Sequence, residues 1–166
     1  MTQVNDNKTI IGRAEKIEIV DLGLLNVPAK TDTGADSSSI WVSQVTEKDD
    51  GLYCIFFGPK NEHYSGKEVY FPKSSYTMTR VANSFGHKEL RYKVKLRIRV
   101  NGRLVKATFT LSNRSLKTYP VLLGRRLLHN KFLVDVTKGK PLHEAERSKA
   151  RRLRQELRDL AKREKK

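Results

Sequence analysis

Cysteine is almost absent from this chain. Among 166 residues only Cys54 carries a thiol, which excludes an internal disulfide. Tyr53 and Ile55 flank it, and a thiol in such apolar surroundings is more often a buried strand residue than a nucleophile. The length is enough for one domain with an appendage, so we expect a fold held together by a hydrophobic core.

Long apolar runs are also missing. No run approaches the roughly 18 residues that are needed to cross a bilayer. Residues 2–8 are polar and do not have the pattern of a signal peptide. The sequence therefore predicts a cytoplasmic protein without a membrane partner.

Acidic residues are scarce relative to basic ones. Lys and Arg number 34 against 18 Asp and Glu, a net charge of +16. Such a charge attracts acidic partners whatever the fold, and nucleic acid, acidic peptides and acidic protein surfaces all qualify. The chain has no aromatic RNA-recognition motif, so nucleic acid is an open but not the favoured partner.

Motifs for metal and nucleotide chemistry are absent as well. The chain has no H-E-x-x-H motif and no G-x-x-x-x-G-K-S/T phosphate loop. Its histidines are scattered without metal-ligand spacing: His63, His87, His129 and His143. We therefore expect no metal site, no cofactor and no ATP binding by this chain.

The chain does contain short alternating segments that are typical of strands. Residues 91–100 alternate cationic with apolar side chains, which predicts a strand with one apolar and one cationic face. Asn101-Gly102 predicts a type I′ hairpin turn, with residues 103–111 as the returning strand. Weaker strand candidates are residues 10–22, 52–57 and 68–71. This pattern indicates an all-β domain.

Two segments depart from the strand pattern. Residues 73–88 accumulate Ser, Thr, Asn and Gly, which predicts a mobile loop or a hairpin. After Pro141 the composition favours a basic helix, with Leu153, Leu157 and Leu160 in one narrow stripe that would rest on the β domain or on a second subunit. The predicted organisation is a disordered segment 1–9, a β domain 10–137 and a helix 141–166.

The segment Asp32-Thr33-Gly34-Ala35-Asp36 puts a carboxylate on a glycine-bearing turn between two extended runs. The same residue types also form purely structural turns. Far downstream, residues 119–128 read Tyr-Pro-Val-Leu-Leu-Gly-Arg-Arg-Leu-Leu. This order predicts a buried strand that enters a helical turn.

Taken together, these segments resemble the retroviral-type aspartic proteases. The match is closer to a bacterial retropepsin-like family that is often labelled ATP-dependent zinc protease and found beside ATP-grasp glutamate ligases. It is carried by residues 29–35, 83–91, 111–114, 120–125 and 132–135. The resemblance implies a closed retropepsin-like (acid protease) β-barrel and a functional link to such a ligase, whereas the zinc and ATP of the label find no support in the motifs.

The resemblance also implies aspartic protease chemistry. Two carboxylates must share one proton, because like charges about 3 Å apart cannot both ionise. The motif occurs once, so two copies of Asp32 would have to meet in a homodimer. By the same resemblance, Thr33 would hydrogen-bond across the dimer axis and Gly34 would let the loop approach the substrate.

Substrate contacts are implied for Ala35, Asp36, Gly86, His87 and Arg125. Asp36 and Arg125 match positions that pair near the substrate channel, although they could also be unrelated surface charges. Gly86 and His87 lie where a flap would cover the substrate, although a loop histidine is more often a surface residue.

Two features differ from the retropepsin pattern. Thr31 precedes the motif, where an apolar residue is usual, and the candidate flap lacks a glycine-rich tip. The cationic strand also has two interpretations. It is either the solvent face of a half-buried sheet or a surface for an acidic strand such as a glutamate-rich tail, because side chains two apart repeat every roughly 6.6–6.8 Å in both partners.

Two functions therefore stay open. The first is a homodimeric aspartic endopeptidase that acts on acidic or glutamate-rich protein segments. The alternative is a non-catalytic retropepsin-like binding module for RNA or acidic protein, in which Asp32 has a structural role.

Overall fold

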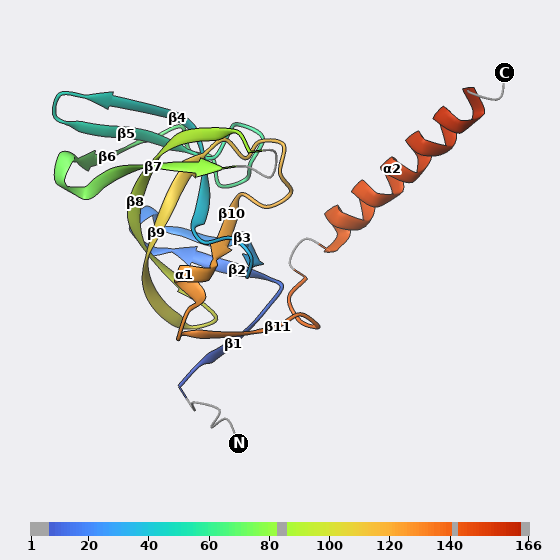
Figure 1. Ribbon diagram of the computed structural model, residues 1–166, viewed down its shortest axis with the longest axis horizontal. Coiled ribbons are helices and arrows are strands. Elements are labelled where there is room, and N and C mark those ends of the chain that lie inside the picture. Colours follow the sequence, from blue (N-terminus) through green and yellow to red (C-terminus); the bar gives the residue numbers. More distant parts are fainter. Residues whose placement is uncertain (1–6, 83–85, 141–142, 164–166) are drawn as a thin grey trace.

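The fold is mostly β, with two 3-10 turns, a short helix and a long C-terminal helix in the part of the chain that the structure describes (Figure 1). It was obtained as a computed structural model, which describes residues 7–82, 86–140 and 143–163. The elements are β1 (Thr9–Gly12), β2 (Ala14–Ile19), η1 (Val20–Leu22), β3 (Leu24–Asp32), β4 (Ser38–Lys48), β5 (Gly51–Phe56), β6 (Glu68–Pro72), η2 (Lys73–Ser75), β7 (Tyr76–Ala82), β8 (Lys88–Val100), β9 (Arg103–Ser112), β10 (Val121–Gly124), α1 (Arg125–Leu128), β11 (Phe132–Asp135) and α2 (His143–Arg163).

The strand pairings form a ring. β10 lies between β3, which it pairs in parallel, and β4, which it pairs antiparallel. From β3 the pairings continue through β2, β8 and β9 to β4, and so return to β10. β5 and β6 extend the sheet beyond β4, β7 pairs with β8, and β1 and β11 form a separate parallel pair. The mostly β fold and the C-terminal helix agree with the sequence-based prediction.

The core is built from the apolar faces of these strands. The fully buried large side chains include Ile17, Ile19, Val27, Leu96, Ile98, Phe109 and Leu123. Burying each such side chain contributes roughly 1.5–3 kcal/mol to stability before entropy costs are counted. Cys54 is a buried strand residue in β5, as predicted, and burial raises the pKa of its thiol to about 12.

The hairpin predicted at Asn101-Gly102 is present. β8 and β9 pair antiparallel around it, and both turn residues have positive φ values, 45° and 80°, as a type I′ turn requires. Along β8 the apolar side chains from Val94 to Val100 are buried, while Lys95, Arg97 and Arg99 are exposed. The alternation in the sequence therefore predicted both the strand and its two faces.

The beginning of the chain differs from the prediction. Residues 10–22 form β1, β2 and η1 and not one strand, because β1 pairs with β11 whereas β2 pairs with β3 and β8. The predicted disorder of residues 1–9 is too long at its end, since Thr9 already belongs to β1. Residues 1–6 lie outside the described part of the chain.

The segment 73–88 contains a hairpin, one of the two predicted alternatives. After η2, β7 pairs antiparallel with β8 from Tyr76 opposite Val94 to Ala82 opposite Lys88. Residues 83–85 lie outside the described residues.

Helix α2 is present as predicted, but its apolar stripe does not rest on the β domain. The helix projects away from the strands (Figure 1), and Leu153, Leu157 and Leu160 are 55–57% exposed. Its first turns are attached to the β domain, where Glu146 accepts hydrogen bonds from Arg13 and from the hydroxyl of Tyr119. Packing of the stripe on a second subunit stays a prediction. In the described residues, no helix has both the length and the apolar character of a membrane span.

Candidate active site

The loop that contains Asp32 is joined to α1 by backbone hydrogen bonds. β10 runs parallel to β3, with Gly124 opposite Asp32. Just beyond this point the N–H of Arg125 donates to the carbonyl of Ala35 at 2.7 Å, and the N–H of Arg126 donates to the carbonyl of Asp36 at 3.1 Å. The two segments singled out in the sequence, about 90 residues apart, therefore form one unit.

The carboxylate of Asp32 is oriented by its own loop. Its Oδ1 accepts hydrogen bonds from the N–H groups of Gly34 and Ala35, both at 3.0 Å. Such bonds from backbone donors fix the carboxylate in one rotamer. A Cβ added to Gly34 would lie 3.5 Å from Oδ1, an ordinary contact. Steric contacts within the chain therefore do not require a glycine at position 34. The reason predicted from the resemblance, a close approach of the loop to the substrate, stays open.

Two threonines in this loop differ in their surroundings. Thr33 is exposed, so its predicted role across a dimer axis is open to test. Thr31 is buried, and its hydroxyl donates to the carbonyl of Gly12 at 2.8 Å while its N–H donates to the carbonyl of Arg13. The polar residue before the motif thus attaches β3 to the turn between β1 and β2, which explains this difference from the retropepsin pattern.

The ion pair predicted between Asp36 and Arg125 is present. Both side chains are about 60% exposed, at 59% and 62%. The pair adds a side-chain connection to the backbone bonds between the loop and α1. Its contribution to stability is small because water screens exposed pairs.

Gly124 is required by the close packing of β10 on the loop. A Cβ at this position would lie 2.4 Å from the carbonyl carbon of Ser37 and 2.5 Å from its oxygen. The N–H of Gly124 donates to the hydroxyl of Ser38 at 3.0 Å. The glycine before Arg125 therefore allows the loop to approach the strand behind it.

A cavity of about 580 Å³ lies between the loop and the β7–β8 hairpin. Residues 34–37 line one side and residues 79–82 of β7 line the other. The hairpin therefore faces the loop across this cavity, and its role as a flap stays a prediction. Gly86, with a φ of 80°, and His87 are exposed near its turn. Neither is among the described residues that line this cavity, so their predicted contact with substrate has no support from the arrangement.

The basic residues around this cavity were not among the predicted site residues, although Arg91 and Lys93 belong to the cationic strand for which an acidic ligand was one interpretation. Arg91, Lys93, Arg114 and Arg126 line it. The alternating cationic face of residues 91–99 was a signal for the first two, and Arg126 directly follows a predicted site residue.

Arg114 is the missed residue with the most direct relation to Asp32. Together they line a second cavity of about 410 Å³, which also contains Glu146 and Lys149 of α2. Burial lowers the pKa of Arg114 and Arg91 adds to this effect, while the charge of Asp32 opposes it. The Nε of Arg114 donates to the carbonyl of Tyr119 at 3.1 Å, which holds the guanidinium between the two cavities. The sequence did offer one signal for Arg114, because it belongs to the segment 111–114, which contributes to the resemblance to the retropepsin-like family.

The donor set does not suggest a metal centre. Across the described ranges, no group of three or more His, Cys, Asp or Glu side chains comes close enough together to hold an ion. The D-T-G motif occurs once in the sequence. A carboxylate pair built from this motif alone would take one Asp32 from each of two chains.

Comparison with known proteins identifies a family match over the same part of the chain. The profile of the RimB-like family, described as retropepsin-like aspartic endopeptidase RimB, matches residues 10–141. A crystal structure of a Legionella pneumophila protein of unknown function superposes with a TM-score of 0.59 at 28% identity, and the match covers 79% of this chain and 95% of that one.

Three similar curated proteins carry another kind of name. Proteins from Shewanella pealeana and Shewanella halifaxensis, each named probable alpha-L-glutamate ligase, are 33% identical over 134 residues. A Desulfotalea psychrophila protein of the same name is 28% identical over 130 residues. These matches cover 77–80% of this chain but only 28–29% of the relatives. The family match includes both the D-T-G loop and the strand behind it, and the chain belongs to the RimB-like family of retropepsin-like aspartic endopeptidases.

Proposed function

We propose that this protein is an aspartic endopeptidase that works as a homodimer and hydrolyses peptide bonds with one Asp32 from each subunit. The observation that carries the proposal is the fixed carboxylate of Asp32, held by two N–H groups of its own loop. Residues 34–37 of this loop line a cavity under the β7–β8 hairpin, and Asp32 lines the neighbouring cavity with Arg114. Membership in the RimB-like family supports it. We infer that the ring of strands is the retropepsin-like barrel and that the site is completed across a two-fold axis.

The chemistry follows from two carboxylates that share a proton. The ionised Asp32 takes a proton from water, and the protonated Asp32 of the other subunit donates a hydrogen bond to the scissile carbonyl. The water oxygen then adds to the carbonyl carbon. Collapse of the tetrahedral species breaks the C–N bond, and the proton goes to the leaving amine.

The substrate we propose is an extended, acidic or glutamate-rich protein segment. The cavity between the loop and the hairpin has a basic lining that includes Arg91, Arg114 and Arg126. Carboxylates on the substrate would meet these guanidinium groups. The glutamate ligase names of the relatives agree with a functional link to an ATP-grasp ligase.

The second candidate is a binding module without catalysis, for RNA or an acidic protein. The net charge of +16 and the same basic lining favour it. In that case Asp32 would serve only to cap its own loop. Binding through several phosphates weakens steeply as salt rises, whereas an aspartic dyad gives a pH profile with two limbs.

Peptide cleavage across pH 4 to 8 tests the proposal. Mixtures of acidic and neutral peptides are incubated with the protein and with its Asp32→Asn variant, and the products are read by mass spectrometry. Sedimentation establishes whether each protein is a dimer. Loss of defined products in the variant supports the dimeric protease. Products that the substitution leaves unchanged, or no products from a protein shown to be dimeric, favour the binding module.

A further inference from the structure

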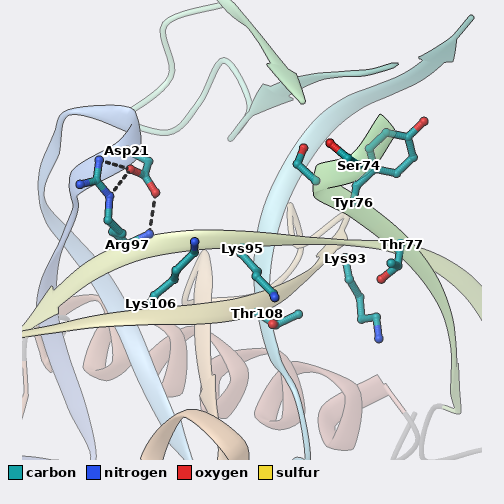
Figure 2. A pocket seen from close by; sticks show the side chains of 10 residues that line it. Asp21, Ser74, Tyr76, Thr77, Lys93, Lys95, Arg97, Lys106 and Thr108 are labelled. Carbon is teal, nitrogen blue, oxygen red and sulfur yellow. Dashed lines mark hydrogen bonds and ion pairs between the residues drawn. The ribbon is translucent and has the colours of Figure 1, made fainter. Parts of the chain in front are cut away.

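A larger cavity lies along the outer face of β8 and β9, away from Asp32. Its volume is about 690 Å³. Lys93, Lys95 and Arg97 of β8 and Lys106 and Thr108 of β9 form its floor, and η2 with the start of β7 forms one wall (Figure 2). Asp21 of η1 closes the far end.

The cationic face predicted from the sequence is only partly available to a ligand. Arg97 is bound to Asp21 through its Nε and its backbone N–H, both at 2.7 Å. Arg99 is bound to Glu18 at 2.9 Å. Burial opposes ionisation of Asp21, yet the hydrogen bonds and charge of Arg97 hold the pKa of this carboxyl below its usual value. These two arginines are therefore already neutralised.

Three lysines remain. Among the described residues, Lys93, Lys95 and Lys106 form no ion pair. Figure 2 shows them in a row between the Asp21–Arg97 pair and Thr77. We name these three residues the lysine row.

The lysine row is continuous with the proposed active site. Lys93 lines this cavity and also the cavity beside the Asp32 loop. A smaller cavity of about 240 Å³ joins Lys93 and Lys106 to Ser37 and Arg126. A chain bound under the β7–β8 hairpin thus has a basic path along the sheet.

We propose that the lysine row is a secondary binding site for the carboxylates of an acidic polypeptide, several residues away from the bond that is cleaved. Its effect on cleavage rests on the proposed function, but binding at this site does not need Asp32 to react. Lys93 and Lys95 are two residues apart on one strand face, a spacing of roughly 6.6–6.8 Å that equals the spacing of alternate side chains on an extended peptide. The site would select substrates whose acidic residues continue beyond the cleft.

The surroundings favour a polypeptide over single-stranded nucleic acid. Proteins that bind single strands stack bases on aromatic rings. The sole aromatic residue that lines the cavity in the described chain is Tyr76. Its ring packs edge-on against Tyr92 with centroids 5.9 Å apart, and its hydroxyl donates to Glu47 at 2.7 Å. Tyr76 is therefore already engaged.

Binding to a catalytically inactive protein tests the site directly. In the Asp32→Asn background, fluorescence anisotropy measures the affinity for a labelled peptide of about ten glutamates, which extends to roughly 33 Å at about 3.3 Å per residue. We expect the Lys95→Glu/Lys106→Glu variant to bind about tenfold more weakly or worse. The matched control is Lys60→Glu/Lys67→Glu. Lys60 and Lys67 are both exposed between β5 and β6, and replacing them causes the same change in net charge. The affinity of this control variant for the peptide should stay within about twofold of that of the parent protein.

Several outcomes would overturn the proposal. These are equal losses in the two variants, no binding to the inactive protein, or tighter binding of an RNA oligonucleotide that depends on the same lysines. Circular dichroism melting confirms that each variant is folded.

Kinetics with Asp32 intact separate this site from the proposed function. Lys95→Glu/Lys106→Glu should raise KM for the long acidic peptide, with kcat unchanged, and should leave a short peptide that fills only the cleft unaffected. An unchanged KM for the long peptide contradicts the proposal. If the protein cleaves nothing, the proposed function fails, whereas the anisotropy comparison still decides whether the lysine row binds.

Discussion

Gly124 lies opposite Asp32 in the register of β10 and β3, and no side chain fits between that glycine and Ser37. Because the loop that contains Asp32 packs directly against β10, the position of Asp32 depends on Gly124, a residue about 90 positions away that has no functional group.

Gly124→Ala should therefore damage both fold and function. The added Cβ would lie 2.4 Å from the carbonyl carbon of Ser37, so the loop must shift away from β10. We expect a loss of about 1–3 kcal/mol in the free energy of unfolding, measured by urea denaturation, together with loss of cleavage. Unchanged stability would mean that the loop can move at no cost and that the close approach has no importance.

Gly34→Ala is the contrasting substitution. Its Cβ would meet Asp32 only at an ordinary 3.5 Å, so the free energy of unfolding should change by less than about 1 kcal/mol. If the loop approaches the substrate closely, as the resemblance implies, cleavage should fall by about tenfold or more. Full activity in a stable Gly34→Ala protein would remove Gly34 from the substrate site.

Thr31→Val tests the attachment of β3 to the start of the chain. The valine keeps the β-branched shape but removes the buried hydrogen bond to Gly12, at a cost of about 1–3 kcal/mol. Thr31→Ser keeps the hydroxyl and loses one methyl group, worth about 0.8 kcal/mol. Denaturation curves should therefore place the valine variant below the serine variant, and the reverse order would show that packing dominates at this position.

Much of this arrangement could be predicted because the signals were local. The alternation along β8 and the Asn101-Gly102 turn specify their own geometry. The contact between Asp36 and Arg125 was predicted in another way. It is long-range, and the family resemblance of the D-T-G loop and the later Gly-Arg pair indicated that the two residues meet.

The remainder depends on partners distant in sequence. The break at Arg13 arises because β1 pairs with β11, about 120 residues away, and not with the strands that β2 joins. Likewise Asp21 neutralises Arg97 from 76 residues away and Glu18 neutralises Arg99 from 81. Periodicity predicts that a side chain faces solvent but not which opposite charge will meet it there.

The Asp21–Arg97 pair gives a pH-dependent prediction. Burial opposes the charge of Asp21, but the bonds from Arg97 prevail and lower its pKa. A carboxyl whose pKa is lowered by folding stabilises the fold at pH values above the pKa that it has in the unfolded chain, about 3.9. This stabilisation is lost as the pH falls through the pKa of the folded state.

Asp21→Asn keeps the shape of the side chain and removes its charge. At pH 7 the variant should be less stable by about 1 kcal/mol, a modest amount because Arg97 is half exposed. Urea denaturation at pH 7, 5 and 3 should show the difference between the two proteins persisting at pH 5 and shrinking at pH 3, because below about 3.9 the unfolded chain increasingly binds the proton that folding makes Asp21 release. A difference that stays constant down to pH 3 would mean that the ion pair does not stabilise the fold. The same variant releases Arg97 toward the lysine row, so its affinity for an acidic peptide should rise and not fall.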